Sequence, residues 1–268
     1  MTAVLRNALW GYRFSLLFVG GGLFAFSLMI AYIFSALGGL ELIRQFEQFI
    51  PEAMRALFKA QGGFASDATG FLASDYRHPM YLVAELAFVI ALSSGAVARE
   101  VERGGILMVL ANPIPRWRYL VARILAMVVG TVVILALAVA GTWVGAQVAG
   151  IGDEVTLPPF LKVQVATFSL MMAVGGVATL ISSVGNDGAR ATAIATGIAV
   201  AMYFVDFLAA LWSPASFLGP VSFFHYYDPQ TVAESGLLPW RDLAVLHGAA
   251  AATFAAALLL FQRRDIAR

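Results

Sequence analysis

Six apolar runs, each long enough to cross a lipid bilayer, constrain the fold of this 268-residue chain more than any other feature. A transmembrane helix needs about 20 predominantly apolar residues. The runs lie at about residues 14–37, 79–98, 119–149, 160–184, 191–212 and 243–261. Because the hydrocarbon core of a bilayer offers no partner for a free backbone group, these runs must be helical. The sequence therefore predicts an all-α polytopic membrane protein with six transmembrane helices.

Charged residues make up only 12% of the chain, well below the share in soluble domains, so a soluble globule is excluded. The net charge of +1 and the lack of a basic patch with interleaved aromatic residues predict no nucleic-acid partner. If the N-terminus is cytoplasmic, the cytoplasmic segments hold Arg6, Arg13, Arg99, Arg103, Arg116, Arg118, Arg190, Arg263, Arg264 and Arg268. The connections at 150–159 and 213–240 then lie outside and hold no Lys or Arg. The positive-inside rule thus favours both termini in the cytoplasm.

One external segment departs from this charge rule. Residues 38–78 would lie outside, although they contain Arg44, Arg55, Lys59 and Arg77. Residues 41–60 within it carry apolar side chains at three- and four-residue spacing, which is typical of an amphipathic helix. We expect this segment to pack on the membrane or on neighbouring helices. The functional alternative is a docking site for a periplasmic or surface partner.

The other segments fit a single membrane domain over residues 1–268, because no internal repeat or linker divides the chain. Residues 1–13 mix apolar residues with two arginines, which predicts a helix on the inner membrane face; a disordered tail is the alternative. Residues 213–240 are rich in aromatic residues, Pro and Gly, and are interpreted as external re-entrant helices, an interfacial aromatic belt or both. Gly141 and Gly145 form a small-xxx-small pair, which predicts close helix packing.

The charged segment at residues 99–118 is unusual because glycine and proline interrupt it between two apolar runs. Residues 99–112 predict one short helix, with Glu100 and Glu102 in its first turn, where the helix dipole favours anions. Pro113 would end this helix, because proline lacks the backbone donor that a helix interior needs. An ordinary basic connection between two spans is the alternative, but it explains only the arginines.

This charged segment resembles the permease subunits of ABC-2 type ATP-binding cassette transporters. In that family the loop between the second and third spans reads approximately Glu-x-x-x-Gly-Thr, then aliphatic residues, then Pro-x-Ser-Arg, and a basic residue seven positions on. The matching residues here are Glu100, Gly104, Ile106, Leu110, Pro113, Arg116 and Arg123. Two positions differ, because Gly105 replaces the usual Thr and Pro115 replaces the usual Ser.

The resemblance implies a type V exporter-like ABC-2 permease fold, in which residues 99–118 form a coupling helix seated in a groove of a separate cytosolic ATPase. The residues expected to contact that ATPase are Glu100, Glu102, Arg103, Gly104, Gly105, Ile106, Leu110, Pro113 and Arg116. Two permease chains, expected to be a homodimer, and two ATPase chains would form one exporter. No cofactor is expected in this chain, since the ATPase would bind ATP and Mg²⁺. The expected location is a bacterial or archaeal cytoplasmic (inner) membrane, crossed several times.

Two carboxylates lie within predicted spans, Glu85 in the second and Asp206 in the fifth. Intramembrane carboxylates are costly and usually face a protein interior or a water-filled path. At about 1.5 Å per residue, each lies roughly 9 Å inside the outer end of its span. The second and fifth spans line the central cavity in ABC-2 permeases, so the resemblance implies that both carboxylates form a polar ring on the substrate path. The alternative is that a neighbouring hydroxyl or backbone group holds each one for packing.

Rival functions differ in the role that they give these carboxylates. An ion-coupled secondary transporter would use Glu85 and Asp206 to carry protons, but the inverted repeats common in such folds are missing. A membrane anchor that only recruits a partner would leave both without a role. Catalysis by this chain is not expected, because the sequence has no cysteine, no nucleophile elbow and no zinc-binding histidine pair.

Overall fold

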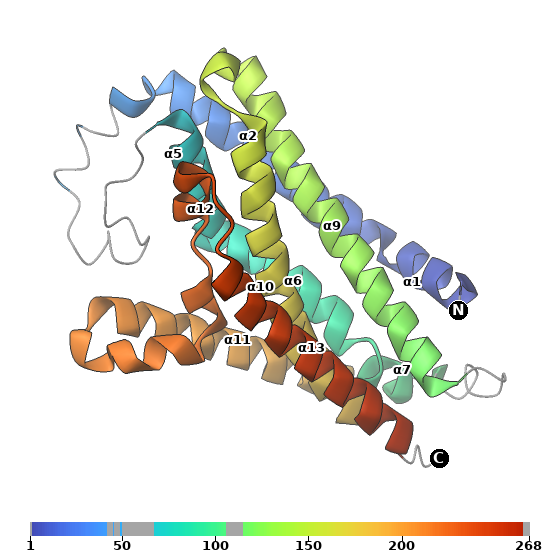
Figure 1. Ribbon diagram of the computed structural model, residues 1–268. Helices are drawn as coiled ribbons and strands as arrows, with labels where there is room; N and C mark the ends of the chain where they lie inside the picture. Colours follow the sequence, from blue (N-terminus) through green and yellow to red (C-terminus); the bar gives the residue numbers. More distant parts are fainter. Residues whose placement is uncertain (1, 42–44, 46–48, 50–66, 106–114, 265–268) are drawn as a thin grey trace.

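The computed structural model describes residues 2–41, 45, 49, 67–105 and 115–264. Every regular element in these residues is a helix, and no strand occurs among them. The predicted all-α class is therefore confirmed for the described part of the chain (Figure 1). The predicted amphipathic helix at residues 41–60 lies almost entirely outside the described residues.

Within the described residues, five helical segments are long and apolar enough to cross a membrane. They are Thr2–Ala36, which combines α1 and α2, and the single helices α9 (Arg116–Val148), α10 (Leu157–Val184), α11 (Gly188–Leu211) and α13 (Trp240–Arg263). The remaining predicted span, the second at residues 79–98, corresponds to the apolar helix α6 (Pro79–Ser94), which has only 16 residues. It is shorter than the predicted run because the chain turns at Gly95, so a sixth crossing stays a prediction.

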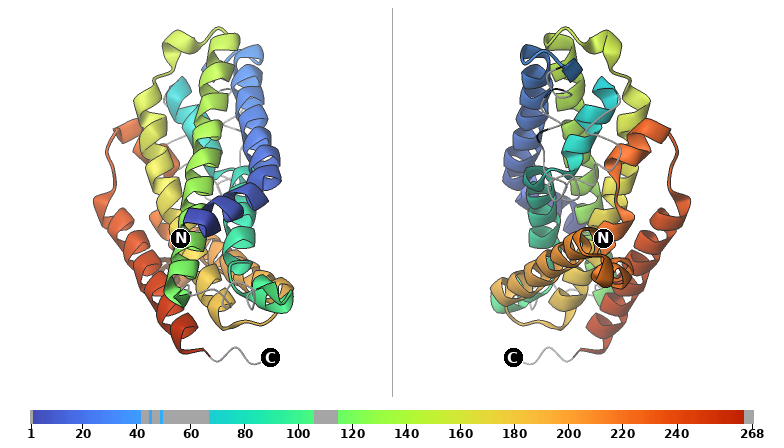
Figure 2. Two further views of the ribbon diagram at one scale, coloured as in Figure 1. Left: turned by 90° about the vertical axis from the view of Figure 1, so that its right-hand side faces the viewer. Right: turned by 90° about the vertical axis from the view of Figure 1, so that its left-hand side faces the viewer.

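The first long segment changes direction at a π-helical stretch. It consists of α1 (Thr2–Ser15), the π-helix η1 (Leu16–Gly20) and α2 (Gly21–Ala36). A π-helical turn inserts an extra residue and is a common cause of kinks. Figure 2 shows α1 bending away from the direction of α2. The predicted N-terminal helix is thus present and runs directly into the first span, while its position on the membrane face stays a prediction.

Short helices connect the long ones. They are α5 (Ala68–Ser74), η2 (Asp75–Arg77), α7 (Ala98–Glu102), η3 (Gly152–Glu154), η4 (Ser213–Val221), η5 (Phe223–Tyr226) and α12 (Pro229–Ser235). The region at 213–240 therefore consists mainly of short helices, but its insertion into the membrane stays a prediction.

The ends of α2, α9 and α10 gather at two ends of the bundle, whereas Figure 1 and Figure 2 show α11 lying across it at a steep angle. At the end that carries α5, Ser35 donates a hydrogen bond to the carbonyl of Ala149 at 2.8 Å. At the end that carries α7, Ser182 donates to the carbonyl of Ser94 at 2.6 Å, and Val4 packs on an apolar cluster formed with α13. We call these the α5 end and the α7 end. Figure 1 shows both chain termini at the α7 end.

Small residues allow the long helices to pack closely. A Cβ atom at Gly141 of α9 would lie 2.8 Å from the Cα atom of Phe24, and one at Gly145 would lie 2.8 Å from the Cα atom of Leu28. The predicted packing role of this glycine pair is confirmed, with α2 as the neighbour. The most buried span is α10, and a Cβ atom at its Gly176 would clash with Thr253 of α13.

The predicted helix at residues 99–112 is wrong in its extent. α7 covers only Ala98–Glu102. Gly104 follows with a φ angle of +71°, the left-handed conformation that commonly ends a helix. From residue 106 to residue 114 the segment lies outside the described residues.

Candidate functional site

The α7 end holds the residues that the sequence assigns to an ATPase contact. The Oε1 atom of Glu100 lies 3.7 Å from Nη2 of Arg123 on α9. The same Nη2 atom donates to the carbonyl of Gly95 at 3.2 Å, and the Arg123 guanidinium lies over the ring of Tyr12 at 5.4 Å. Glu100 is partly exposed, so this ion pair contributes little stability. Its effect is geometric, because it joins α7 to α9.

Glu102 joins α7 to the first residue of α11. Its carboxylate accepts a hydrogen bond from the backbone N–H of Gly188 at 2.9 Å. The first N–H groups of a helix have no partner within the helix, and the dipole there favours an anion. A Cβ atom at Gly188 would lie 2.9 Å from the Cβ atom of Arg99, so glycine allows α7 to lie this close. α7 and the start of α11 are therefore placed to move together.

Two glycines follow α7, and they have different surroundings. Apart from the adjoining residues, no described residue has an atom within 4 Å of a Cβ atom built at Gly104. A Cβ atom at Gly105 would lie 2.7 Å from Oε2 of Glu100. The departure from the family pattern at Gly105 thus leaves room for the Glu100 carboxylate, which a threonine side chain would displace.

The remaining predicted contact residues are only partly described. Arg103 is exposed, and Arg116 at the start of α9 donates to the carbonyl of Arg264. Arg264 in turn donates to the carbonyls of Ser183 at 3.0 Å and Gly185 at 2.9 Å. These bonds hold the start of α9, the end of α10 and the end of α13 together. The predicted contact residues outside the described part of the chain are Ile106, Leu110 and Pro113.

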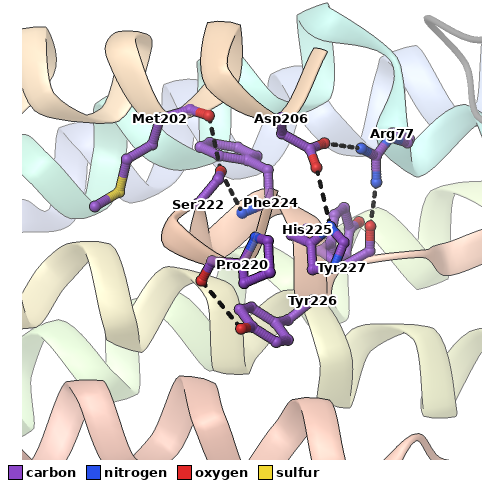
Figure 3. Close-up of polar contacts among 9 residues, drawn as sticks. All are labelled: Arg77, Met202, Asp206, Pro220, Ser222, Phe224, His225, Tyr226 and Tyr227. Atoms are coloured by element: carbon purple, nitrogen blue, oxygen red, sulfur yellow. Dashed lines mark hydrogen bonds and ion pairs between the residues drawn. The ribbon is translucent and has the colours of Figure 1, made fainter. Parts of the chain in front are cut away.

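Asp206 of α11 forms a buried ion pair with Arg77 of η2 (Figure 3). Its Oδ2 atom lies 2.8 Å from Nη2 of Arg77, and neither side chain is more than 6% exposed. Arg77 also donates to the carbonyl of Tyr227. On the other carboxylate oxygen, Nδ1 of His225 lies 3.7 Å away. Asp206 therefore connects α11 to η2 and to the residues around η5.

The pairing of Arg77 with Asp206 was not predicted from the sequence. Arg77 appeared there only as an exception to the positive-inside rule. That exception was a usable signal, because a carboxylate inside a span needs a compensating charge or hydrogen bond. What the sequence does not supply is the turn at η2, which brings Arg77 to α11.

Glu85 of α6 lies in different surroundings. It is fully buried, and neither of its carboxylate oxygens makes a hydrogen bond with a described residue. Burial and, second, the nearby Glu85 carboxyl raise the pKa of the Tyr227 hydroxyl, which is hydrogen-bonded to Thr167 at 3.0 Å. The two predicted path residues are thus not hydrogen-bonded to each other. Asp206 is paired with a cation, whereas Glu85 is enclosed beside a tyrosine.

An apolar groove with a volume of about 200 Å³ lies between α6 and α11. Its walls include Leu82 and Val83 of α6 and Val200 and Tyr203 of α11, and Phe224 of η5 borders it. Tyr203 precedes Asp206 by three residues, about one helical turn. The second and fifth predicted spans therefore share a groove that approaches the buried ion pair.

Comparison with protein families adds an independent observation. A family model described as ABC-2 family transporter protein matches residues 15–266. Comparison with curated proteins and with solved structures finds no match. The matched range contains α7, the α6–α11 groove and both buried carboxylates, and it gives no support to the ion-coupled alternative. The chain therefore belongs to the ABC-2 family of transporter membrane proteins, as a multi-pass permease component.

Proposed function

We propose that this chain is the permease subunit of an ATP-binding cassette exporter. Two copies would form a homodimer, and each would bind one cytosolic ATPase subunit that carries ATP and Mg²⁺. The observation that carries the proposal is the bond from Glu102 of α7 to the first residue of α11, in a chain of the ABC-2 family. This bond gives a movement of α7 a direct route into a membrane span. Export is the direction that the family resemblance implies.

The proposal orients the chain with its α7 end in the cytoplasm of a bacterial or archaeal cell. Arginines at this end support the orientation through the positive-inside rule; they include Arg99, Arg103, Arg116, Arg118 and Arg190. Residues 1–13 would then lie on the inner membrane face. Residues 38–78 and 213–240 would lie outside, where residues 38–78 would pack on the membrane or dock an external partner. Residues 1–268 would form one membrane domain.

The proposed transport cycle couples α7 to the groove between α6 and α11. ATP binding would draw the two ATPases together and displace α7, and Glu102 would pass the displacement to α11. At the far end of α11, Asp206 would then shift against Arg77 and alter the cavity between the two permeases. Glu85 and Asp206 would set the polarity beside this path. A substrate would bias the cycle only through different affinities for the two states.

Co-purification from native membranes tests this proposal. We would isolate the tagged chain in mild detergent and identify the co-purifying proteins by mass spectrometry, for the wild type and for Gly104→Trp. A stoichiometric soluble ATPase is expected with the wild type. Its loss is expected with Gly104→Trp, because the indole would occupy the open space beside α7.

Gly150→Trp is the matched control for this experiment. Gly104 and Gly150 have φ angles of +71° and +75°, and beyond the adjoining residues neither has an atom of the described chain within 4 Å of a built Cβ atom. The two substitutions therefore impose similar backbone strain, but at opposite ends of the bundle. ATPase retention with Gly150→Trp and loss with Gly104→Trp would locate the contact at the α7 end. A stable wild-type chain that purifies alone would contradict the proposal.

A further inference from the structure

A second apolar groove lies between α9 and α10. Its volume is about 510 Å³, which falls within the range of small-molecule sites. Val132 and Trp143 mark its extent along α9, and Leu161 and Phe168 belong to its α10 wall. Val132, Trp143 and Leu161 are at least 36% exposed, so the groove opens at the surface of two membrane spans.

Among the described residues in the wall of this apolar groove, Gln164 contributes a polar amide side chain. Gln164 of α10 is only 8% exposed, and neither its Nε2 nor its Oε1 atom makes a hydrogen bond with a described residue. The amide lies near the hydroxyl of Tyr76 but does not reach hydrogen-bond geometry, and that hydroxyl is already bonded to Thr142 at 2.8 Å. A buried amide without a partner costs about 1–3 kcal/mol. A ligand in the groove that accepts or donates a hydrogen bond would remove this cost.

The length and depth of the groove match one leaflet of a bilayer. From Val132 to Trp143 the groove follows α9 for about 16 Å, close to half of the roughly 30 Å hydrocarbon core. α10 has 28 residues and is about 42 Å long, so its first turn or more extends into the headgroup layer. Gln164 then lies near the boundary between headgroups and acyl chains, where the ester carbonyls of a glycerolipid are found. Trp143 lies at the same end of the bundle, as is common for interfacial tryptophan.

We propose that the α9–α10 groove binds one acyl chain of a glycerolipid from the leaflet at the α5 end, and that Gln164 donates a hydrogen bond to its ester carbonyl. A protein helix, about 10 Å across, is too wide for a groove of this volume and length. The site is separate from the α6–α11 groove and does not depend on the proposed export function.

Tryptophan fluorescence provides the test, because Trp143 lines the groove. In the full chain, Trp10, Trp117, Trp212 and Trp240 would be replaced by Phe, which leaves Trp143 as the only tryptophan. The purified protein in detergent would be titrated with phosphatidylcholine brominated in the upper part of its acyl chains. A matching dialkyl ether lipid, which lacks ester carbonyls, would be titrated in parallel. We expect saturable quenching, with half-saturation by the ester lipid at a several-fold lower concentration.

Two variants of the single-tryptophan protein separate the groove from the general lipid surface. Gln164→Leu is expected to abolish the difference between ester and ether lipids. Val132→Phe is expected to weaken quenching several-fold, because Val132 lines the groove. Its neighbour Val133 is exposed but does not line the groove, so Val133→Phe is the control. Quenching that rises without saturation, or that is equal for ester and ether lipids before any further substitution, would overturn the proposal. The comparison of ester with ether lipid needs only the single-tryptophan protein, so it tests the proposal even if the Gln164 or Val132 variant fails to fold.

Discussion

Arg77 and Asp206 form an ion pair in which each charge depends on the other. Both side chains are almost completely buried, and the guanidinium also bonds the carbonyl of Tyr227. Removing one partner of a buried pair leaves the other charge uncompensated, which typically costs 3–5 kcal/mol. Removing both charges leaves no uncompensated charge in the interior, so it costs much less. The pair therefore acts as a joint between α11 and η2 rather than as two separate contacts.

A double-mutant cycle measures this dependence. We expect Arg77→Met to lower the free energy of unfolding by about 3 kcal/mol or more, and Asp206→Asn to lower it by less, because the guanidinium keeps its bond to Tyr227. Arg77→Met combined with Asp206→Asn should be more stable than Arg77→Met alone. Unfolding of the detergent-purified variants by heat or denaturant provides the measurement. Simply additive losses would show that the two charges are not coupled.

Asp75, two residues before Arg77, predicts a pH dependence of stability. Burial raises the pKa of its carboxyl from 3.8 to about 7. The folded state therefore binds the proton more tightly than the unfolded state. The contribution of Asp75 to the free energy of unfolding is greatest below about pH 4. It falls as the pH rises from about 4 to about 7 and is then constant.

Asp75→Asn removes this titration. The variant should be more stable than the wild type at pH 8, by up to about 4 kcal/mol at roughly 1.4 kcal/mol per pKa unit. The difference should shrink towards zero near pH 4. Thermal unfolding of both proteins across this pH range checks the expectation. A difference that stays constant with pH would assign the effect to packing and not to ionisation.

At the scale of elements, the sequence predicts what depends on composition and misses what depends on single backbone angles or distant partners. Apolar runs locate the long helices, because lipid allows no other backbone structure. The extent of the helix after α6 was overestimated because the left-handed conformation of Gly104 is not visible in an apolar pattern. The π-helical stretch Leu16–Gly20 and the bond from Glu102 to Gly188 were also not foreseen, because both arise from tertiary packing.

The contact between α2 and α9 depends on the missing side chains of two glycines. Gly141→Ala is expected to destabilise the protein by about 1–3 kcal/mol, because the added methyl group meets the backbone of Phe24. Gly248→Ala on α13 is the control, since nothing lies within 4 Å of a built Cβ atom there. The control should be neutral or slightly stabilising, because alanine favours a helix more than glycine does. Equal melting temperatures for the two variants would argue against close packing of α2 on α9.

At the scale of the whole molecule, α7 and both described chain ends lie together. The α9–α10 connection and α12 lie at the other end. This arrangement makes the number of membrane crossings testable, because an even number puts the two termini on one side. α6 decides the count, since its 16 residues extend about 24 Å. The bilayer would have to thin, or the η2 turn would have to enter it, for α6 to complete a crossing.

Cysteine labelling distinguishes these topologies without background, because the chain contains no cysteine. Thr2→Cys, Arg103→Cys and Arg263→Cys are exposed positions at the α7 end, and Asp153→Cys is exposed at the α5 end. With a membrane-impermeant maleimide on intact cells, we expect only Asp153→Cys to react. The other three should react once the membrane is opened. Opposite accessibility of Thr2→Cys and Arg103→Cys would mean that α6 does not cross.

The packing of α10 also has a consequence for how the protein is made. α10 is the most buried of the described spans, and its Gly176 lies against Thr253 of α13, which is synthesised after it. Until α13 arrives, the small and polar side chains of that α10 face are open to lipid, which packs poorly against them. The bundle therefore closes around α10 only after α13 has been synthesised. A chain that stops before residue 240 would present this unfinished face to the proteases and chaperones that survey the membrane.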